Sequence, residues 1–199
     1  MQVNVRGRWL SKAVLASLAW TMAEPSFAAS AEHPGFQAST QGNTMNTTTL
    51  AGEAADRLAI RELIDAWAHD ADRKLAAAQA ALFTENGVVE VYVAEPGTDS
   101  KPAQVLRGRK EIESGIGEAL KQYAVTMHVN GQSTVQIDGD QASNESYTLA
   151  HHFWTEDGRR MLLVMGIRYR DTIVRKDGHW LFAKRKLVID WTDRRPSTP

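Results

Sequence analysis

The chain has 199 residues, no cysteine and a formal net charge of −1, with 43% hydrophobic and 24% charged residues. These values are typical of a single globular domain with a sizeable core. The lack of cysteine excludes disulfides, thiol nucleophiles and thiolate metal sites. Lys and Arg are spread along the chain without a basic stripe, so nucleic acid is not expected as a partner.

Residues 1–28 have the pattern of a secretory signal peptide: basic residues, the short apolar segment 13–23, and small residues up to Ala28. We therefore expect cleavage after Ala28 and a periplasmic or secreted protein. The apolar segment is too short to serve as a membrane anchor. If the true start is Met45, the protein would instead be cytoplasmic. Residues 29–53 are rich in Ser, Thr, Gln, Asn and Gly and are expected to form a flexible leader.

Residues 54–192 are expected to form one α+β domain. Apolar residues at helical spacing predict a first helix over 54–72. A run of strong helix formers predicts a second helix over 74–83. A β-rich segment predicts a short strand over 87–93, and another apolar stripe predicts a third helix over 110–123.

From residue 126 onward the pattern is that of strands only. Turn signals at 139–140, 157–158 and 177–178 predict an antiparallel meander of four long strands. A sheet of this length is expected to curl around the helices. The predicted fold is therefore α+β, a curved antiparallel sheet with three N-terminal helices packed in its hollow, forming a cone-shaped α+β barrel. The polar residues 193–199 are expected to form a loose tail.

The first hairpin of the meander places histidines close together. If residues 139–140 form a two-residue loop, strand pairing puts His128 directly opposite His151 on one face of the sheet. Tyr147 would share that face, whereas His152 would point to the other. A β-bulge would exchange the two neighbouring histidines. The alternative to a functional role is a hydrogen-bonded core or edge histidine.

The candidate partner of His128 is Asp72, at the end of the first predicted helix. In the functional interpretation its carboxylate points into the hollow and holds the imidazole in one tautomer. In the alternative, Asp72 is a solvated surface carboxylate, and Asp70 has an equal claim on composition. Tyr92 and Tyr169 are either core aromatic residues or, in a pocket, hydrogen-bond donors to a substrate oxygen.

Metal and cofactor sites have little support in the sequence. Three histidines and an aspartate would suffice to bind one ion, but the H-x-H and H-E-x-x-H spacings are absent. The chain also lacks a phosphate-binding loop and a G-x-S-x-G nucleophile elbow. We therefore expect neither a metal nor a cofactor.

Several short motifs follow one another through residues 54–192. They are Trp67–Asp72, Leu82–Gly87, Arg107–Arg109, His128–Asn130, Ile137–Ala142, and Tyr169–Asp171 through Asp177–Trp180 to Asp190–Trp191. Together they resemble the SnoaL-like branch of the nuclear-transport-factor-2-like superfamily. The resemblance implies the cone-shaped fold, which hosts many different activities.

Within that superfamily the pocket residues resemble those of dehydratases and dehydrochlorinases, in which an Asp–His pair removes a proton to drive elimination. By motif position, the resemblance implies that Asp72 and His128 form this pair. It also implies that His151 is a second pocket histidine and that Tyr92 holds a water molecule. A second water-holding tyrosine of the dehydratases is Ala71 in this chain, so the substrate does not carry over with the resemblance.

The predicted function is a cofactor-independent lyase, of dehydratase or dehydrohalogenase type, acting on a small and largely apolar molecule. His128 is expected to be the general base, Asp72 to orient it, and His151 to assist as an acid or hydrogen-bond donor. The residues expected to position substrate or water are Tyr92, Tyr147 and Tyr169. The alternatives are an isomerase or cyclase with the same base, or a non-catalytic binding or assembly domain. An exposed apolar sheet face would favour a homodimer or homotrimer.

Overall fold

The computed structural model describes residues 47–97 and 100–198, so the expected signal peptide lies outside the described residues. The described elements are, in chain order, α2 (Thr47–Asp72), α3 (Ala76–Ala81), β1 (Phe83–Tyr92), β2 (Gln104–Arg107), α4 (Gly108–Lys121), β3 (Val125–Asp138), β4 (Gln141–Glu156), β5 (Arg159–Lys176) and β6 (His179–Pro196). Within these ranges no helix is long and apolar enough to cross a membrane.

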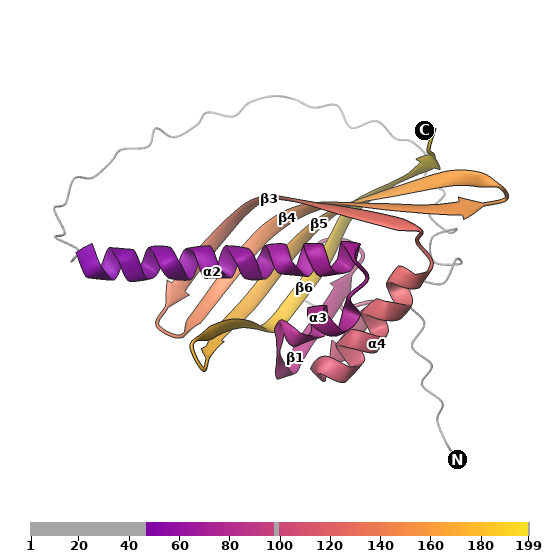
Figure 1. The fold of residues 1–199 in the computed structure, drawn as a ribbon. Coiled ribbons are helices and arrows are strands. Elements are labelled where there is room, and N and C mark those ends of the chain that lie inside the picture. Colours follow the sequence, from indigo (N-terminus) through magenta and orange to yellow (C-terminus); the bar gives the residue numbers. More distant parts are fainter. Residues whose placement is uncertain (1–46, 98–99, 199) are drawn as a thin grey trace, which may run out of the picture.

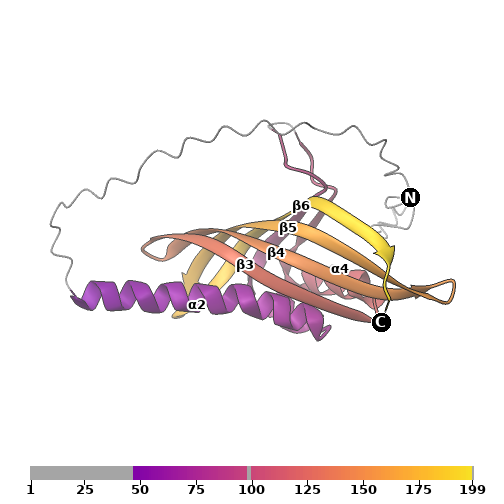
Figure 2. The same ribbon diagram turned by 90° about the horizontal axis from the view of Figure 1, so that it is seen from above.

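The strands form one curved, open sheet of six strands in the order β2-β1-β6-β5-β4-β3. The helices α2, α3 and α4 lie on one face of this sheet, which curves over them (Figures 1 and 2). The antiparallel meander of β3 to β6 and the curved sheet with helices in its hollow are confirmed. One pairing differs from the expected fully antiparallel sheet, because β1 runs parallel to β6. The sheet is therefore mixed.

Helix α2 buries Ile60, Ile64 and Trp67 against the sheet. Leu58, which the helical spacing places in the same apolar stripe, is instead 61% exposed. The helix begins at Thr47, so it includes the end of the segment 29–53 that was expected to be a flexible leader.

Several predicted boundaries are also different. The second helix is shorter than predicted, since α3 ends at Ala81 and β1 already begins at Phe83. The short strand β2 was not predicted; it pairs antiparallel with β1. At the C-terminus, β6 continues pairing as far as Pro196, opposite Met161. Residues 193–196 are therefore part of the sheet and not of a loose tail.

A β-bulge in β3 sets which side chains face the helices. The turn at residues 139–140 has two residues as predicted, with Asp138 paired to Gln141, and the register holds as far as Ser133 opposite Ser146. Beyond that point it shifts, because residues 131–132 together oppose the single residue Tyr147. As a result His128 pairs with Ala150 and not with His151.

Helix α2 is fastened to the edge strand β3 on both sides of this bulge. The side-chain amide of Asn130 donates to Asp65 Oδ1 at 2.8 Å, and Arg61 Nη1 donates to the carbonyl of Gly131 at 3.2 Å. Further along, Arg57 Nη1 donates to the carbonyl of Val135 at 2.9 Å. These bonds cover part of an otherwise unpaired strand edge and hold the C-terminal end of α2 beside the start of β3.

The opposite, convex face of the sheet exposes apolar side chains. Val129, Leu149, Gly166 and Trp191 occupy one row across β3, β4, β5 and β6. Val129 is 51% exposed, Leu149 43% and Trp191 50%. The indole of Trp191 lies so close to Gly166 that an added Cβ would be 2.2 Å from its Nε1 atom. This row is an apolar strip on the outside of the molecule.

Candidate active site

The end of α2 is held in place by the residue that terminates it. Lys74 has a positive φ of 58°, which is uncommon for a residue with a side chain. Its backbone N–H donates to the carbonyl of Ala71 at 3.0 Å, and the backbone N–H of Leu75 donates to the backbone carbonyl of Asp70 at 2.8 Å. Its ammonium group donates to the carbonyl of Tyr123, just before β3, at 2.5 Å. The end of α2 is thereby tied to the residues just before β3.

The carboxylate of Asp72, at that helix end, accepts three hydrogen bonds from β3. Its Oδ1 lies 2.7 Å from His128 Nδ1 and 3.0 Å from the hydroxyl of Thr126, and its Oδ2 accepts from the backbone N–H of His128 at 2.9 Å. Burial acts to raise the pKa of Asp72. The hydrogen bonds and the charge of His128 outweigh burial, however, so the pKa lies below its ordinary value.

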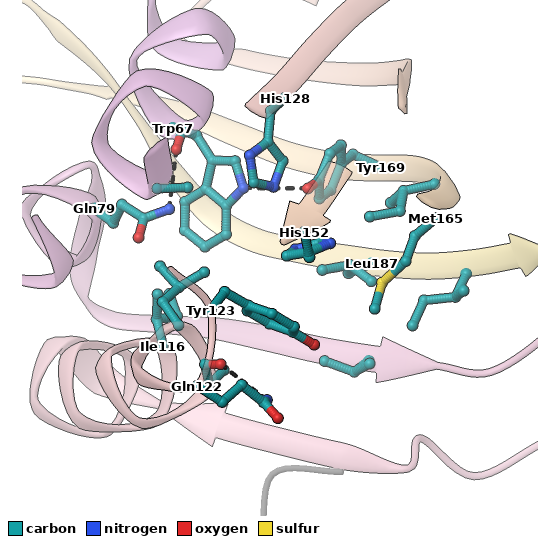
Figure 3. Close-up of a pocket in the computed structure, with 16 residues that line it drawn as sticks. Trp67, Gln79, Ile116, Gln122, Tyr123, His128, His152, Met165, Tyr169 and Leu187 are labelled. Atoms are coloured by element: carbon teal, nitrogen blue, oxygen red, sulfur yellow. Dashed lines mark hydrogen bonds between the residues drawn. The ribbon is translucent and has the colours of Figure 1, made fainter. Parts of the chain in front are cut away.

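This arrangement defines the state of the His128 ring. An ionised carboxylate can only accept hydrogen bonds, so Nδ1 must carry the proton that is shared with Asp72. In the neutral ring, Nε2 then has a free lone pair. The ring lines a cavity together with fifteen other residues (Figure 3). The arrangement therefore presents a basic nitrogen to whatever occupies that cavity.

The cavity has a volume of about 100 Å³. A single water needs only roughly 10–15 Å³, so there is room for a compact organic molecule. Most of the lining is apolar and comes from both the helices and the sheet. The polar lining residues are Gln79, Gln122, Tyr123, His128, His152 and Tyr169. In the part of the chain that the structure describes, no three His, Asp or Glu side chains are grouped so as to hold a metal ion.

His152, and not His151, is the second histidine of the cavity. The bulge pairs His152 with Thr126, which puts it on the His128 face, and the two imidazole centroids are 5.6 Å apart. Burial and the nearby charge of His128 lower the pKa of His152 to about 4. Near neutral pH the ring is uncharged, and its buried Nδ1 has no hydrogen-bond partner among the described residues.

Tyr169 forms a rigid part of the cavity wall. The indole N–H of Trp67 donates to its hydroxyl at 3.3 Å, and the tyrosine is 2% exposed. Behind its ring, at 4.2 Å, lies the guanidinium of Arg185, which forms a fully buried ion pair with Asp171. Burial raises the pKa of Tyr169, so the hydroxyl keeps its proton and can donate it in a hydrogen bond.

The expectation that His151 faces His128 is wrong. His151 pairs with Met127 on the convex face, and its Nδ1 lies 3.3 Å from the carbonyl of that residue. The physical reason is the bulge, since a shift of one residue in register moves a side chain to the other face of a sheet. Gly131 was the available signal, because an isolated glycine within a strand pattern often marks a bulge.

Two of the three predicted substrate-binding tyrosines do not reach the cavity. Tyr92 donates a hydrogen bond to Glu90 at 3.1 Å, while its neighbour Val91 lines the cavity in its place. Tyr147 is 38% exposed on the convex face. Only Tyr169 lies where it was expected. Successive side chains of a strand point to opposite faces of the sheet. Because Val91 faces the cavity, its neighbour Tyr92 faces away from it.

Gln79 is a cavity residue that the sequence interpretation missed. It is the one polar side chain in α3, whose sequence is AAAQAA, and it is 1% exposed. A lone glutamine in an alanine-rich helix was the available signal, but surface glutamines in helices are common. Tyr123, counted in the apolar stripe of the third helix, also lines the cavity.

Comparison with known proteins agrees with this architecture. Uncharacterized proteins of Mycobacterium bovis and Mycobacterium tuberculosis are 26% identical over 133 residues, which is 67% of this chain and 84% of theirs. A protein from Novosphingobium aromaticivorans, described as a candidate scytalone dehydratase, has a TM-score of 0.60 at 24% identity, covering 78% of this chain and 97% of its own. The dehydrochlorinase LinA has a TM-score of 0.60 at 16% identity, covering 75% and 95%.

At these identities the structural matches show the fold. The family is shown by the sequence itself, because the model of the SnoaL-like domain matches residues 52–186. This match covers the helices, the first strands and most of the meander. The chain therefore belongs to the SnoaL-like domain family.

Proposed function

We propose that the protein is a cofactor-independent lyase that removes a proton from a small, largely apolar substrate and expels a leaving group from the neighbouring carbon. One observation carries this proposal. The Asp72 carboxylate lies 2.7 Å from His128 Nδ1 at the wall of an apolar cavity. A histidine that is oriented by a carboxylate and keeps a free ring nitrogen has the arrangement that general base catalysis requires.

In the proposed reaction, Nε2 of His128 takes a proton from a C–H group of the substrate. The electrons of that bond form a C=C bond, and the leaving group departs with the electrons of its own bond. When the leaving group is a hydroxyl, the imidazolium returns the proton to it and water is released; a halide departs as the anion. Asp72 stays ionised and stabilises the imidazolium. General base catalysis of this kind contributes about 10²- to 10⁴-fold to the rate.

The other polar groups of the cavity have supporting roles. His152 is uncharged near neutral pH, because its pKa is lowered to about 4. It therefore acts as a hydrogen-bonding group toward the substrate and not as a cationic acid. The hydroxyl of Tyr169 keeps its proton and is available to a substrate oxygen. The apolar walls exclude water, which strengthens each of these interactions.

The comparisons support elimination as the class of reaction. One of the similar structures is described as a candidate scytalone dehydratase and another as a hexachlorocyclohexane dehydrochlorinase, names that describe the loss of water and of hydrogen chloride. They suggest the first compounds to test, which are small β-hydroxy ketones and hexachlorocyclohexane. Enone absorbance reports dehydration, and release of chloride reports dehydrochlorination.

The decisive variant is His128→Gln, which keeps a polar side chain but removes the base. We expect it to lose at least about 100-fold in turnover. The matched control is His151→Gln, on the convex face, which should keep wild-type turnover. Proton removal can also be followed as exchange of the α-hydrogen of the ketone for deuterium, even without loss of a leaving group. Wild-type exchange and turnover in His128→Gln would refute the proposal.

A further inference from the structure

The phenol side chain of Tyr123 is held rigidly at the wall of the cavity. Tyr123 follows the end of α4, and its backbone N–H donates to the carbonyl of Leu120 at 3.2 Å. Its own carbonyl accepts from Lys74 Nζ at 2.5 Å. The ring packs against His152 at a centroid distance of 4.5 Å and against Trp154 at 6.0 Å. Both the backbone and the ring of Tyr123 are therefore fixed in place.

The hydroxyl of Tyr123 is an unused polar group that a small molecule can reach. Burial raises its pKa and no hydrogen bond contributes, so the hydroxyl keeps its proton. The side chain lines the cavity and is 8% exposed. In residues 47–97 and 100–198, the fully buried side-chain atoms without a hydrogen-bond partner belong to Gln79, Asn144, His152, Arg175 and Arg185. The Tyr123 hydroxyl is not among these sealed atoms, so it is open to an occupant of the cavity.

Several other donors that line the cavity are already used within the protein. The side-chain amide of Gln79 donates to the carbonyl of Trp67 at 2.9 Å, and the indole N–H of Trp67 donates to Tyr169 at 3.3 Å. The side-chain amide of Gln122 donates to a carbonyl of α4 at 3.1 Å. The rest of the lining is mostly apolar. Tyr123 therefore offers a hydrogen-bond donor in surroundings that supply it with few acceptors.

We infer that Tyr123 is a substrate-binding residue, whose hydroxyl donates a hydrogen bond to a carbonyl oxygen of the molecule that occupies the cavity. A carbonyl oxygen only accepts hydrogen bonds, so it satisfies this donor without bringing another donor into an apolar cavity. The inference rests on the proposed function and narrows its substrate class to carbonyl compounds, because a carbon-bound chlorine offers no comparable acceptor.

The bound carbonyl group would lie near the base. The ring of His152 lies between those of Tyr123 and His128 in the close-up view (Figure 3), with its centroid 4.5 Å from the first and 5.6 Å from the second. A ring-sized molecule that lies along His152 would therefore contact both. With its oxygen held by Tyr123, such a molecule presents C–H groups to His128. Tyr123 is thus an orienting residue and not a base.

The binding experiment compares two probes of the same shape. Cyclopentanone carries a C=O group where methylenecyclopentane carries C=CH₂, and both are titrated into the full-length protein by NMR. The variant Tyr123→Phe removes only the hydroxyl and keeps the ring. We expect it to weaken cyclopentanone binding about three- to tenfold and to leave methylenecyclopentane binding within about twofold. The matched control is Tyr147→Phe, the same change on the convex face, which should alter neither affinity.

Infrared spectroscopy identifies the donor directly. A hydrogen bond lowers the stretching frequency of a carbonyl group. Cyclopentanone labelled with carbon-13 at the carbonyl should therefore absorb at a lower frequency in the wild type than in Tyr123→Phe. The variant Tyr169→Phe removes the other tyrosine hydroxyl of the cavity and should leave the wild-type frequency unchanged. If Tyr123→Phe does not fold, a crystal structure of the wild type with cyclopentanone answers the question, with the oxygen expected at hydrogen-bonding distance from the Tyr123 hydroxyl.

Three results would overturn the inference: a wild-type protein that does not bind cyclopentanone, equal cyclopentanone affinity in the wild type and Tyr123→Phe, or a bound carbonyl oxygen that points away from Tyr123. None of them depends on turnover. Failure of the proposed lyase function, seen as full activity in His128→Gln, would leave the effect of Tyr123→Phe on ketone binding in place. The two failures can therefore be told apart.

Discussion

Replacing Asp72 by asparagine changes one carboxylate oxygen into an NH₂ group and leaves the shape almost unchanged. If the amide oxygen takes the place of Oδ1, the NH₂ group meets the backbone N–H of His128, and two donors face each other. If it takes the place of Oδ2, the oxygen still accepts from the backbone, 2.9 Å away in the wild type. The NH₂ group then faces His128 Nδ1, which can accept only when the proton moves to Nε2.

The second orientation is favoured because every contact keeps a partner. The hydroxyl of Thr126 also adapts, since it can turn its hydrogen toward the carbonyl of Ala71, which lies 3.4 Å away. The cost is the loss of charge from the hydrogen bonds. Charged hydrogen bonds contribute about 1.5–3 kcal/mol and neutral ones about 0.5–1.5 kcal/mol. With the Asp72 side chain 25% exposed, we expect the free energy of unfolding to fall by about 1–3 kcal/mol.

The effect on function should be much larger than the effect on stability. With the proton on Nε2, the ring presents a donor to the cavity and has no lone pair with which to take a substrate proton. We therefore expect Asp72→Asn to reduce turnover by about 10²- to 10⁴-fold while the protein remains folded. Nitrogen-15 chemical shifts of the His128 ring distinguish the two tautomers directly and need no substrate.

The pH dependence has a definite sign. The folded pKa of Asp72 lies below its ordinary value of 3.8, so its stabilising effect is complete above that pH and is lost as the pH falls through the lowered pKa. The difference in unfolding free energy between wild type and Asp72→Asn should thus shrink in acid. The matched control is Asp70→Asn, in the same helix turn. An unchanged His128 tautomer in Asp72→Asn would refute this reasoning.

Three further predictions concern other parts of the molecule. The pKa of His152 is lowered from 6.5 to about 4 in the folded protein. Between pH 6.5 and pH 4, His152 is therefore protonated in the unfolded chain but not in the folded one. The free energy of unfolding should fall by about 3 kcal/mol as the pH drops through this range. Denaturant titrations should show that His152→Phe removes this loss of stability in acid and that His151→Phe, the control, keeps it. Equal changes of unfolding free energy with pH in the two variants would contradict the prediction. We expect a second copy of the chain to cover Leu149 and Trp191. The variant Leu149→Lys should then have a lower molecular mass in light scattering than the wild type. A wild-type protein that is already monomeric would contradict this expectation. Mass spectrometry of exported protein should show cleavage after Ala28, and an uncleaved chain would count against export.

Local signals in the sequence were sufficient for much of the fold. The turns at 139–140, 157–158 and 177–178 depend on residues that tolerate positive φ, and Gly139, Gly158 and Gly178 do have φ of 57°, 74° and 78°. Alternation and helical spacing then locate the strands and helices between turns. The pairing of Asp72 with His128 was expected from the resemblance to SnoaL-like proteins and not from local pattern, because Asp70 lies at the end of the same predicted helix and had an equal claim on composition.

The remaining features depend on contacts between distant parts of the chain. The parallel pairing of β1 with β6 joins residues about a hundred positions apart, for example Val89 and Arg185, and no local pattern encodes it. The short strand β2 owes its existence to pairing with β1. The face of His151 was missed for a related reason, since it depends on a displacement of one residue in β3 that only the assembled sheet determines.

The bulge at residues 131–132 has a consequence for how the protein can vary. Before the bulge, the residues of β3 that face the helices are even-numbered, such as His128. After the bulge they are odd-numbered, such as Val135. Both groups pair with even-numbered residues of β4. Deleting Gln132 would restore the regular alternation of inward and outward side chains along β3. The residues before and after the bulge would both keep their present face. The length of this strand segment can therefore change by one residue while His128 and Val135 both stay on the inner face. A search that demands a fixed spacing between His128 and the hairpin turn would overlook proteins with an equivalent site.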